Sequence, residues 1–298
     1  MTSLVDMSRI SCPSIALIKY PPEQAFKMIA EAGYKNVDVL EKMPHLSIHP
    51  ELCDPAKVLA AAEKAGVRIT NVNSYVGGGV FGRAGAWRHH PGFVFPDKHL
   101  YTSAGFSSPD KEERERELQQ FKRAVDIARF FGARCIRFVV GDDDPAHLDD
   151  LVPWFQRAAE YCEKQGVYMG TENHDTGIMG RPELLVELFE KIGSKYVGVF
   201  YEPYNLMEQA GYDYRKAFEV MRDWIVHVHF KDGKLIRDRR NYKPVMMGLG
   251  EFDFLWILRR LDEIGYKGEI ALEYEVAEIP PEQGIKMFYD NFVQMVAV

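Results

Sequence analysis

The chain has 298 residues, 46% of them hydrophobic, with a formal net charge of −7 at pH 7 and a pI of about 5.8. This length suits two ordinary domains or one large α/β barrel. The acidic balance argues against a nucleic-acid partner, and no apolar run approaches the roughly 20 residues that a membrane span requires.

The four cysteines are scattered without a CxxC pair, and the N-terminus has no basic region followed by an apolar signal core. Both features predict a reducing, cytoplasmic setting in which the cysteines are small core residues. A small molecule is the expected partner.

Short β-like runs alternate with helix-like segments from end to end of the chain. The predicted strands are 9–17, 36–41, 67–75, 134–141, 167–173, 196–203, 225–231 and 269–275. The intervening helical patterns include 21–33, 54–66, 108–132 and 250–265, and several open on Pro, Ser or Asp and close on Gly. Eight such units predict parallel pairing in one (β/α)₈ barrel, a single TIM-barrel domain over residues 1–298.

One connection, 76–109, is far longer than a usual loop between a strand and its helix, and it is rich in Gly and aromatic residues. Long loops of this kind often cover active sites, but a surface excursion or a subunit contact would have the same composition. The aromatic residues are compatible with a homo-oligomer.

The stretch "WIVHVHFKDG" at 224–233 places two histidines one residue apart inside an apolar run. Side chains alternate along a strand, so His227, His229 and Lys231 are predicted on one face. The same rule puts the Val226, Val228 and Phe230 side chains on the other, helix-facing side.

Active sites of such barrels lie where the strands end, so polar residues at strand ends are the candidates. Alternation along strands 5 to 8 predicts an inward polar set near one rim, consisting of Glu172, Glu202, His229 and Glu273. Small residues precede three of them on the same face, namely Gly170, Gly198 and Ala271.

Three inward carboxylates are costly to bury unless a positive charge neutralises them. A divalent cation would do so, and the imidazole completes an O₃N ligand set suited to Mn²⁺, Mg²⁺ or Co²⁺, with Zn²⁺ as a further alternative. A glutamate at a strand end is more often a solvated rim residue when taken singly. The coincidence of four inward polar residues at the ends of consecutive strands favours a metal site.

The motifs "TENH", "VGVFYEPYNL", "HVHFKDG" and "LGEFDFLWILRRLDEIGYKGEIALEYE" resemble the sugar phosphate isomerase/epimerase family, the xylose-isomerase-like barrels. The likeness covers most of the chain and is strongest over 166–275. It implies a divalent metal, with Mn²⁺ preferred, held by Glu172, Glu202, His229 and Glu273, and it implies that His227 is structural.

The chain departs from the family pattern at Glu202, where the family usually has Asp, so the resemblance leaves this ligand open. Asn205 matches the later position of the same pattern. Four residues are candidates for contact with the substrate or for hydrogen-bonded structural roles: His174, Asn205, Lys231 and Arg137.

The resemblance and the paired carboxylates predict an isomerase or epimerase of a keto sugar. Glu172 and Glu273 would face the substrate from different sides, one removing the proton beside the carbonyl and the other returning it, and the ion would stabilise an enediolate. The same residues would suit a lyase, such as an inosose or dehydroshikimate dehydratase or an enzyme that deglycosylates a 3-keto glycoside. A sugar-binding barrel without catalysis is the third alternative, and the Glu202 departure is the argument for it.

Overall fold

The computed structural model describes residues 5–80, 98–141, 144–174, 177–207, 212–236 and 241–297. Within these segments eight parallel strands close a barrel in the order β1-β10-β7-β6-β5-β4-β3-β2. The barrel strands are β1 (Ile10–Pro13), β2 (Asn36–Leu40), β3 (Arg68–Asn73), β4 (Cys135–Phe138), β5 (Tyr168–Glu172), β6 (Val197–Tyr201), β7 (Ile225–Phe230) and β10 (Ile270–Leu272). Each lies within one of the predicted strands, so the (β/α)₈ barrel is confirmed.

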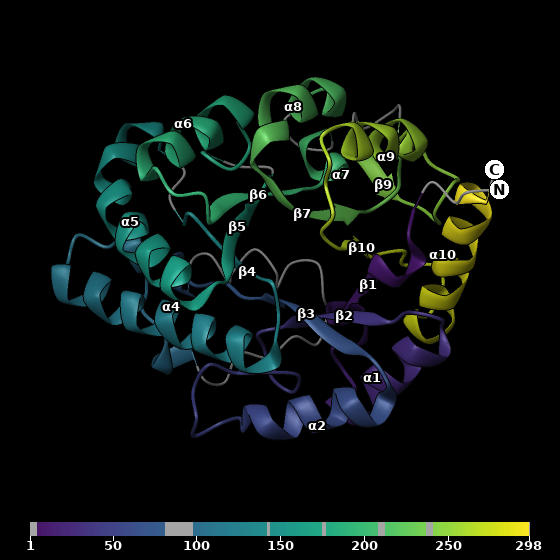
Figure 1. Cartoon of the computed structure of the whole chain (residues 1–298), viewed down its shortest axis with the longest axis horizontal. Helices are drawn as coiled ribbons and strands as arrows, with labels where there is room; N and C mark the ends of the chain where they lie inside the picture. Colours follow the sequence, from purple (N-terminus) through teal and green to yellow (C-terminus); the bar gives the residue numbers. More distant parts are fainter. Residues whose placement is uncertain are drawn as a thin grey trace.

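Helices surround the barrel on the outside (Figure 1). They are α1 (Pro22–Glu31), α2 (Pro55–Ala65), α4 (Lys111–Phe131), α5 (Leu148–Gln165), α6 (Pro182–Ile192), α8 (Tyr214–Met221), α9 (Phe254–Glu263) and α10 (Pro281–Val296). The short helix α7 (Pro203–Asn205) instead follows β6 at the rim of the barrel. Helix α4 illustrates the predicted boundaries, because the Asp110 side chain accepts from the backbone N–H of Glu112 and Gly132 ends the helix with φ +72°.

A two-stranded antiparallel hairpin, β8 (Gly233–Ile236) and β9 (Asn241–Pro244), follows β7 and was not predicted. Asp232, directly before it, accepts backbone N–H bonds from Gly233, Gly248 and Gly250. This carboxylate therefore joins the hairpin to the segment that leads into α9.

Side chains on β7 alternate as predicted at Val228 and Phe230, which pack in the helix-facing core. The prediction for Val226 was wrong, because this side chain packs with Cys135 and Phe200. The ladder between β6 and β7 shifts register between Val199 and Phe200. Such an irregularity offsets the alternation of side chains by one residue, which turns Val226 toward the barrel interior.

The long connection from β3 to α4 lies partly outside the described residues, since 81–97 fall there, and with them most of its aromatic side chains. Two described aromatics of this connection are buried, Tyr101 and Phe106. Phe106 stacks between Phe121 of α4 and Trp154 of α5. This part of the connection is thus packed against the helical layer.

Three of the cysteines, Cys12, Cys135 and Cys162, are buried as predicted, and Cys53 is half-buried. Across the described segments, no helix combines the length and the apolar character that a bilayer crossing would demand.

The loop after β2 is fastened to the loop after β1 by a buried histidine. His45 Nδ1 lies 2.9 Å from the Ser14 hydroxyl and Nε2 lies 3.1 Å from the Tyr20 carbonyl oxygen. The Ser14 oxygen already accepts the Leu40 N–H, so its hydroxyl can donate to Nδ1 while Nε2–H donates to Tyr20. Neutral His45 therefore has both nitrogens satisfied, and burial lowers its pKa to about 4.

We expect this histidine to make folding stability fall in mild acid. The unfolded imidazole binds a proton near pH 6.5, whereas the folded one resists protonation down to about pH 4. The unfolded state therefore binds more protons in this window, and stability is lost as the pH falls through it. Between pH 7 and 4.5 the loss from this one group is about 2 to 3 kcal/mol.

Urea unfolding of the wild type and of the His45→Gln variant at both pH values measures this loss. The variant should lose less stability than the wild type on acidification, by about the same 2 to 3 kcal/mol. Equal acid sensitivity of the two proteins would contradict the assignment.

Candidate functional site

Three of the predicted site residues meet at the carboxyl ends of the barrel strands. Glu172 ends β5, His229 lies near the end of β7, and Glu273 directly follows β10. One potential ligand atom from each lies within 4.8 Å of those from the other two, and all three residues are buried. The backbone N–H of Glu273 donates to the Phe230 carbonyl at 2.9 Å, which extends the β7–β10 pairing to this residue.

Small residues below this rim leave room for an aromatic side chain that supports the histidines. A Cβ on Gly170 would lie 2.4 Å from the Phe200 ring, and one on Gly198 would lie 2.1 Å from a backbone oxygen. Phe200 in turn packs against the rings of His227 and His229, with centroids 4.6 and 5.7 Å apart. Gly170 therefore leaves room for the Phe200 ring that contacts both imidazoles, and Gly198 lets the backbone at Trp224 approach β6 closely.

Two buried cationic side chains accompany the carboxylates. Arg137 Nη1 lies 2.6 Å from Glu172 Oε2. Lys231 Nζ lies 3.3 Å from Glu273 Oε2 and 3.0 Å from Glu275 Oε2. Arg137 and Lys231 therefore supply part of the positive charge that the carboxylates were expected to take from a bound cation.

The two catalytic candidates have different electrostatic surroundings. Burial alone would raise the pKa of Glu172, but His229 and Arg137 outweigh it and hold that pKa well below its usual value. Burial raises the pKa of Glu273, and Lys231 offsets only part of the rise. Glu172 is accordingly the more acidic of the two carboxyl groups.

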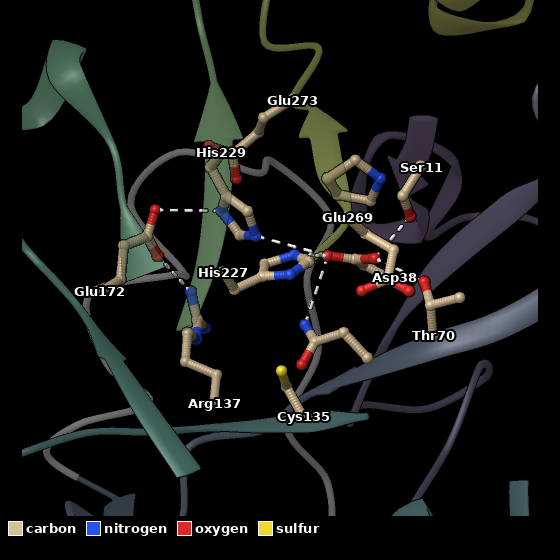
Figure 2. Close-up of polar contacts among 12 residues, drawn as sticks. Ser11, Asp38, Thr70, Cys135, Arg137, Glu172, His227, His229, Glu269 and Glu273 are labelled. Atoms are coloured by element: carbon tan, nitrogen blue, oxygen red, sulfur yellow. Dashed lines mark hydrogen bonds and ion pairs between the residues drawn. The ribbon is translucent and has the colours of Figure 1, made fainter. Parts of the chain in front are cut away.

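His229 lies between two carboxylates in this site (Figure 2). Its Nδ1 is 3.3 Å from Glu172 Oε1, and its Nε2 is 3.4 Å from Asp38 Oδ2. Burial would lower the pKa of His229, but the charge of Glu172 and the contact with Asp38 raise it to about 10. A cation that bound this ring would therefore have to displace a proton.

Glu202 is fully buried near these residues, but its carboxylate serves another purpose in the structure. Its two oxygens accept the backbone N–H groups of Tyr204 and Asn205, at 2.8 and 2.5 Å, and so cap the short helix α7. Burial raises the pKa of Glu202 to about 8, and Lys231 limits the rise. Ligation by Glu202 stays a prediction, and it would require the carboxylate to give up part of this cap.

The other substrate candidates lie around the same rim. Asn205 is buried next to Glu202 in α7. His174, two residues beyond Glu172, is half-buried, and its charge contributes to the low pKa of Glu172. Lys231 also lies over the Tyr204 ring, with Nζ 5.1 Å from the centroid.

The donor set fits a divalent cation. Two carboxylates and one imidazole converge, a combination that suits Mn²⁺, Mg²⁺, Co²⁺ or Zn²⁺. Glu273 Oε2 is buried and accepts no hydrogen bond from the residues that the structure describes. Lys231 Nζ, 3.3 Å away, forms an ion pair with it. A buried carboxylate oxygen in this state can serve as a ligand.

Sequence reasoning missed the residue that joins the two histidines, Asp38 on β2. Its Oδ2 lies 2.7 Å from His227 Nε2. The signal was present, because alternation in "NVDVL" turns Val37 and Val39 outward and Asp38 inward. The resemblance had implied a structural His227, and the structure shows its ring fixed by this carboxylate.

Comparison with known proteins finds curated relatives over about half of the chain. A curated relative, the putative L-ribulose-5-phosphate 3-epimerase SgbU of Escherichia coli, is 25% identical over 56% of this chain and 61% of its own. The curated relatives are matched over 43 to 61% of their own length.

Two solved structures have the same fold over nearly all of both chains. D-allulose 3-epimerase from Methylomonas sp. is 15% identical, has a TM-score of 0.70, and is matched over 96% of this chain and 97% of its own. A xylose isomerase-like TIM barrel protein from Mycobacterium smegmatis in complex with magnesium is 16% identical, has a TM-score of 0.71, and is matched over 100% of both chains.

The sequence model of one family, described as the xylose isomerase-like TIM barrel, matches residues 26–289, which is most of the chain. The match includes Glu172, His229 and Glu273 and seven of the eight barrel strands. This chain therefore belongs to the xylose isomerase-like TIM barrel family.

Proposed function

We propose that this protein is a divalent-metal-dependent isomerase or epimerase of a keto sugar or a related polyol ketone. The observation that carries the proposal is the convergence of Glu172, His229 and Glu273, buried at the end of the barrel where such folds hold their active sites. Two named similar proteins, the putative L-ribulose-5-phosphate 3-epimerase and the D-allulose 3-epimerase, support the same class of reaction.

Glu172, His229 and Glu273 would hold the ion, with Glu202 as the predicted fourth ligand. When bound, the ion would polarise the substrate carbonyl and favour the negative charge that develops on its oxygen. Mn²⁺ is the proposed ion, and the Mg²⁺ complex of the similar M. smegmatis protein supports a divalent cation in this fold.

The proton transfer itself falls to two carboxylates. Glu172 and Glu273 come from strands on different sides of His229, because β5 and β10 flank the β6–β7 pair in the barrel. One carboxylate would remove the proton from the carbon beside the carbonyl, and the other would return a proton to the opposite face. Arg137 keeps Glu172 ionised, which suits it to the role of the base, and the raised pKa of Glu273 suits it to the role of the acid.

The first test is the metal content of protein purified without added metal or chelator. We expect about one Mn, Co, Mg or Zn per chain in the wild type, and loss of that ion in the Glu172→Gln and His229→Ala variants. Elemental analysis measures both. The Glu202→Gln variant distinguishes the two roles of this residue. If Glu202 is a metal ligand, the variant loses the ion; if Glu202 only caps α7, the variant keeps it. Absence of metal from the wild type, even after incubation with Mn²⁺, would overturn metal dependence.

The second test identifies the reaction. We expect the metal-loaded enzyme to exchange the proton beside the carbonyl of a keto sugar with deuterated solvent, which NMR detects. Formation of a dehydrated or cleaved product in place of the epimer would favour the lyase alternative. Metal binding without exchange on any keto sugar would favour a sugar-binding barrel.

A further inference from the structure

Asp38 is a carboxylate of β2 in contact with both histidines of β7 (Figure 2). Its side chain is fully buried. Oδ2 lies 2.7 Å from His227 Nε2 and 3.4 Å from His229 Nε2. No other carboxylate of the described residues is recorded in contact with both rings.

The remaining partners of Asp38 are also hydrogen-bond donors. Oδ1 accepts from the Ser11 hydroxyl at 2.5 Å and from the Thr70 hydroxyl at 3.5 Å, and Oδ2 accepts from the Asn71 amide at 3.3 Å. These three residues come from β1 and β3, the strands on either side of β2.

An ionised carboxylate can only accept hydrogen bonds, so a ring nitrogen that is hydrogen-bonded to Asp38 must carry a hydrogen. His227 Nε2 makes such a hydrogen bond at 2.7 Å, whereas His229 Nε2 approaches the same oxygen at 3.4 Å without a formed hydrogen bond. For His229 the opposite nitrogen, Nδ1, faces Glu172, which forms the candidate ligand cluster with His229 and Glu273. An ion that bound Nδ1 would take its lone pair, so the remaining ring hydrogen of His229 would then be on Nε2, the nitrogen that faces Asp38.

We propose that Asp38 is a positioning residue for the candidate metal site, which holds the Nε2–H of His229 so that Nδ1 is the nitrogen offered to a divalent cation. The inference rests on the proposed function. His227 fixes the position of the Asp38 carboxylate through its 2.7 Å contact, and the same carboxylate contacts His229. A partner of this kind, on the far nitrogen of a metal-binding histidine, fixes the ring orientation and typically changes metal affinity 10- to 100-fold.

A second arrangement of the same atoms has to be distinguished. Ligand atoms of Asp38, His227 and His229 also lie within 4.8 Å of one another and would form a separate cation site. Four hydrogen-bond donors to Asp38 argue against that site, because a carboxylate has about four lone-pair positions and Ser11, Thr70, Asn71 and His227 already engage them. A second ion bound per chain would therefore contradict the proposal.

The test uses Zn²⁺, a diamagnetic probe, with protein labelled with ¹⁵N at histidine. In the Zn²⁺-loaded wild type we expect long-range ¹H–¹⁵N correlations to show a protonated Nε2 and an ion-bound Nδ1 for His229, at one ion per chain. Calorimetry should show Zn²⁺ binding weakened about 10- to 100-fold in Asp38→Asn, in which an amide replaces the obligatory acceptor. Ser11→Ala is the matched control, because it removes one donor to Asp38 and leaves the carboxylate in place, and its affinity should stay within about threefold of wild type.

The outcomes separate this inference from the proposed function. Zn²⁺ bound through Nε2, or with wild-type affinity in Asp38→Asn, would overturn the inference and leave the metal site standing. Failure of the wild type to bind any divalent cation would overturn both. The NMR measurement on wild-type protein is decisive even where Asp38→Asn does not fold.

Discussion

When Mn²⁺ is supplied at a saturating concentration to offset the lost ligand, the Glu172→Gln and Glu273→Gln variants are each expected to lose about 10²- to 10⁴-fold in kcat, the range in which a positioned general acid or base contributes. Glutamine keeps the shape of the side chain but cannot accept the proton. Both carboxyl groups are buried beside His229, so solvent cannot readily take their place. Turnover of the keto sugar that the exchange screen identifies measures the loss.

Proton exchange with deuterated solvent makes this prediction sharper. If two carboxylates serve opposite faces of the substrate, each variant should still exchange the proton of one epimer while failing to form the other. If one carboxylate serves both faces, the same variant should lose exchange with both epimers. Unchanged turnover in both variants would require the isomerase hypothesis to be abandoned.

Glu275→Gln supplies the matched control for both experiments. This carboxylate lies two residues beyond Glu273 and pairs with the same lysine, at 3.0 Å. Its side chain is more exposed, at 21% against 7% for Glu273. We expect its turnover to fall by less than about tenfold, which separates a general effect of lost negative charge from loss of the proton-transfer group.

The sequence carried most of the fold because the signal for a parallel barrel is local. Apolar runs with helix patterns between them, and Gly at helix ends such as Gly132, mark each βα unit without any knowledge of its neighbours. Val226 shows where the local rule fails. Its orientation depends on a register shift against β6, and pairing between strands cannot be seen in the pattern of either strand alone.

The same distinction applies to the site. Glu172, His229 and Glu273 were found because each ends or follows a strand and because the family motifs cover them. Asp38 sits in the middle of β2, away from the strand ends that were searched for candidates, so alternation places it inward but its role becomes visible only when β7 is placed across the barrel. The cap formed by Glu202 is likewise a three-dimensional property, since it depends on how the chain turns into α7.

Lys231→Met is expected to lower the free energy of unfolding by about 3 to 5 kcal/mol at neutral pH, the cost of leaving buried charge without its partner. Lys231 is 6% exposed and contacts Glu273 and Glu275. Methionine keeps much of the aliphatic stem, so the change removes mainly the charge. Urea unfolding of wild type and variant at pH 8 gives the difference.

The pH dependence of that difference tests its cause. Without Lys231 the folded-state pKa of Glu273, already raised by burial, rises further above its unfolded value. The folded variant then binds more protons than the unfolded chain, so its deficit in unfolding free energy grows as the pH rises above about 4.5 and is smaller at pH 5 than at pH 8.

Lys286→Met is the matched control, because Lys286 pairs with Asp290 on an exposed helix face, and its loss should lower the free energy of unfolding by less than about 1 kcal/mol. A Lys231→Met deficit as small as this control, or one that does not change with pH, would mean that Lys231 is not what compensates the buried glutamates.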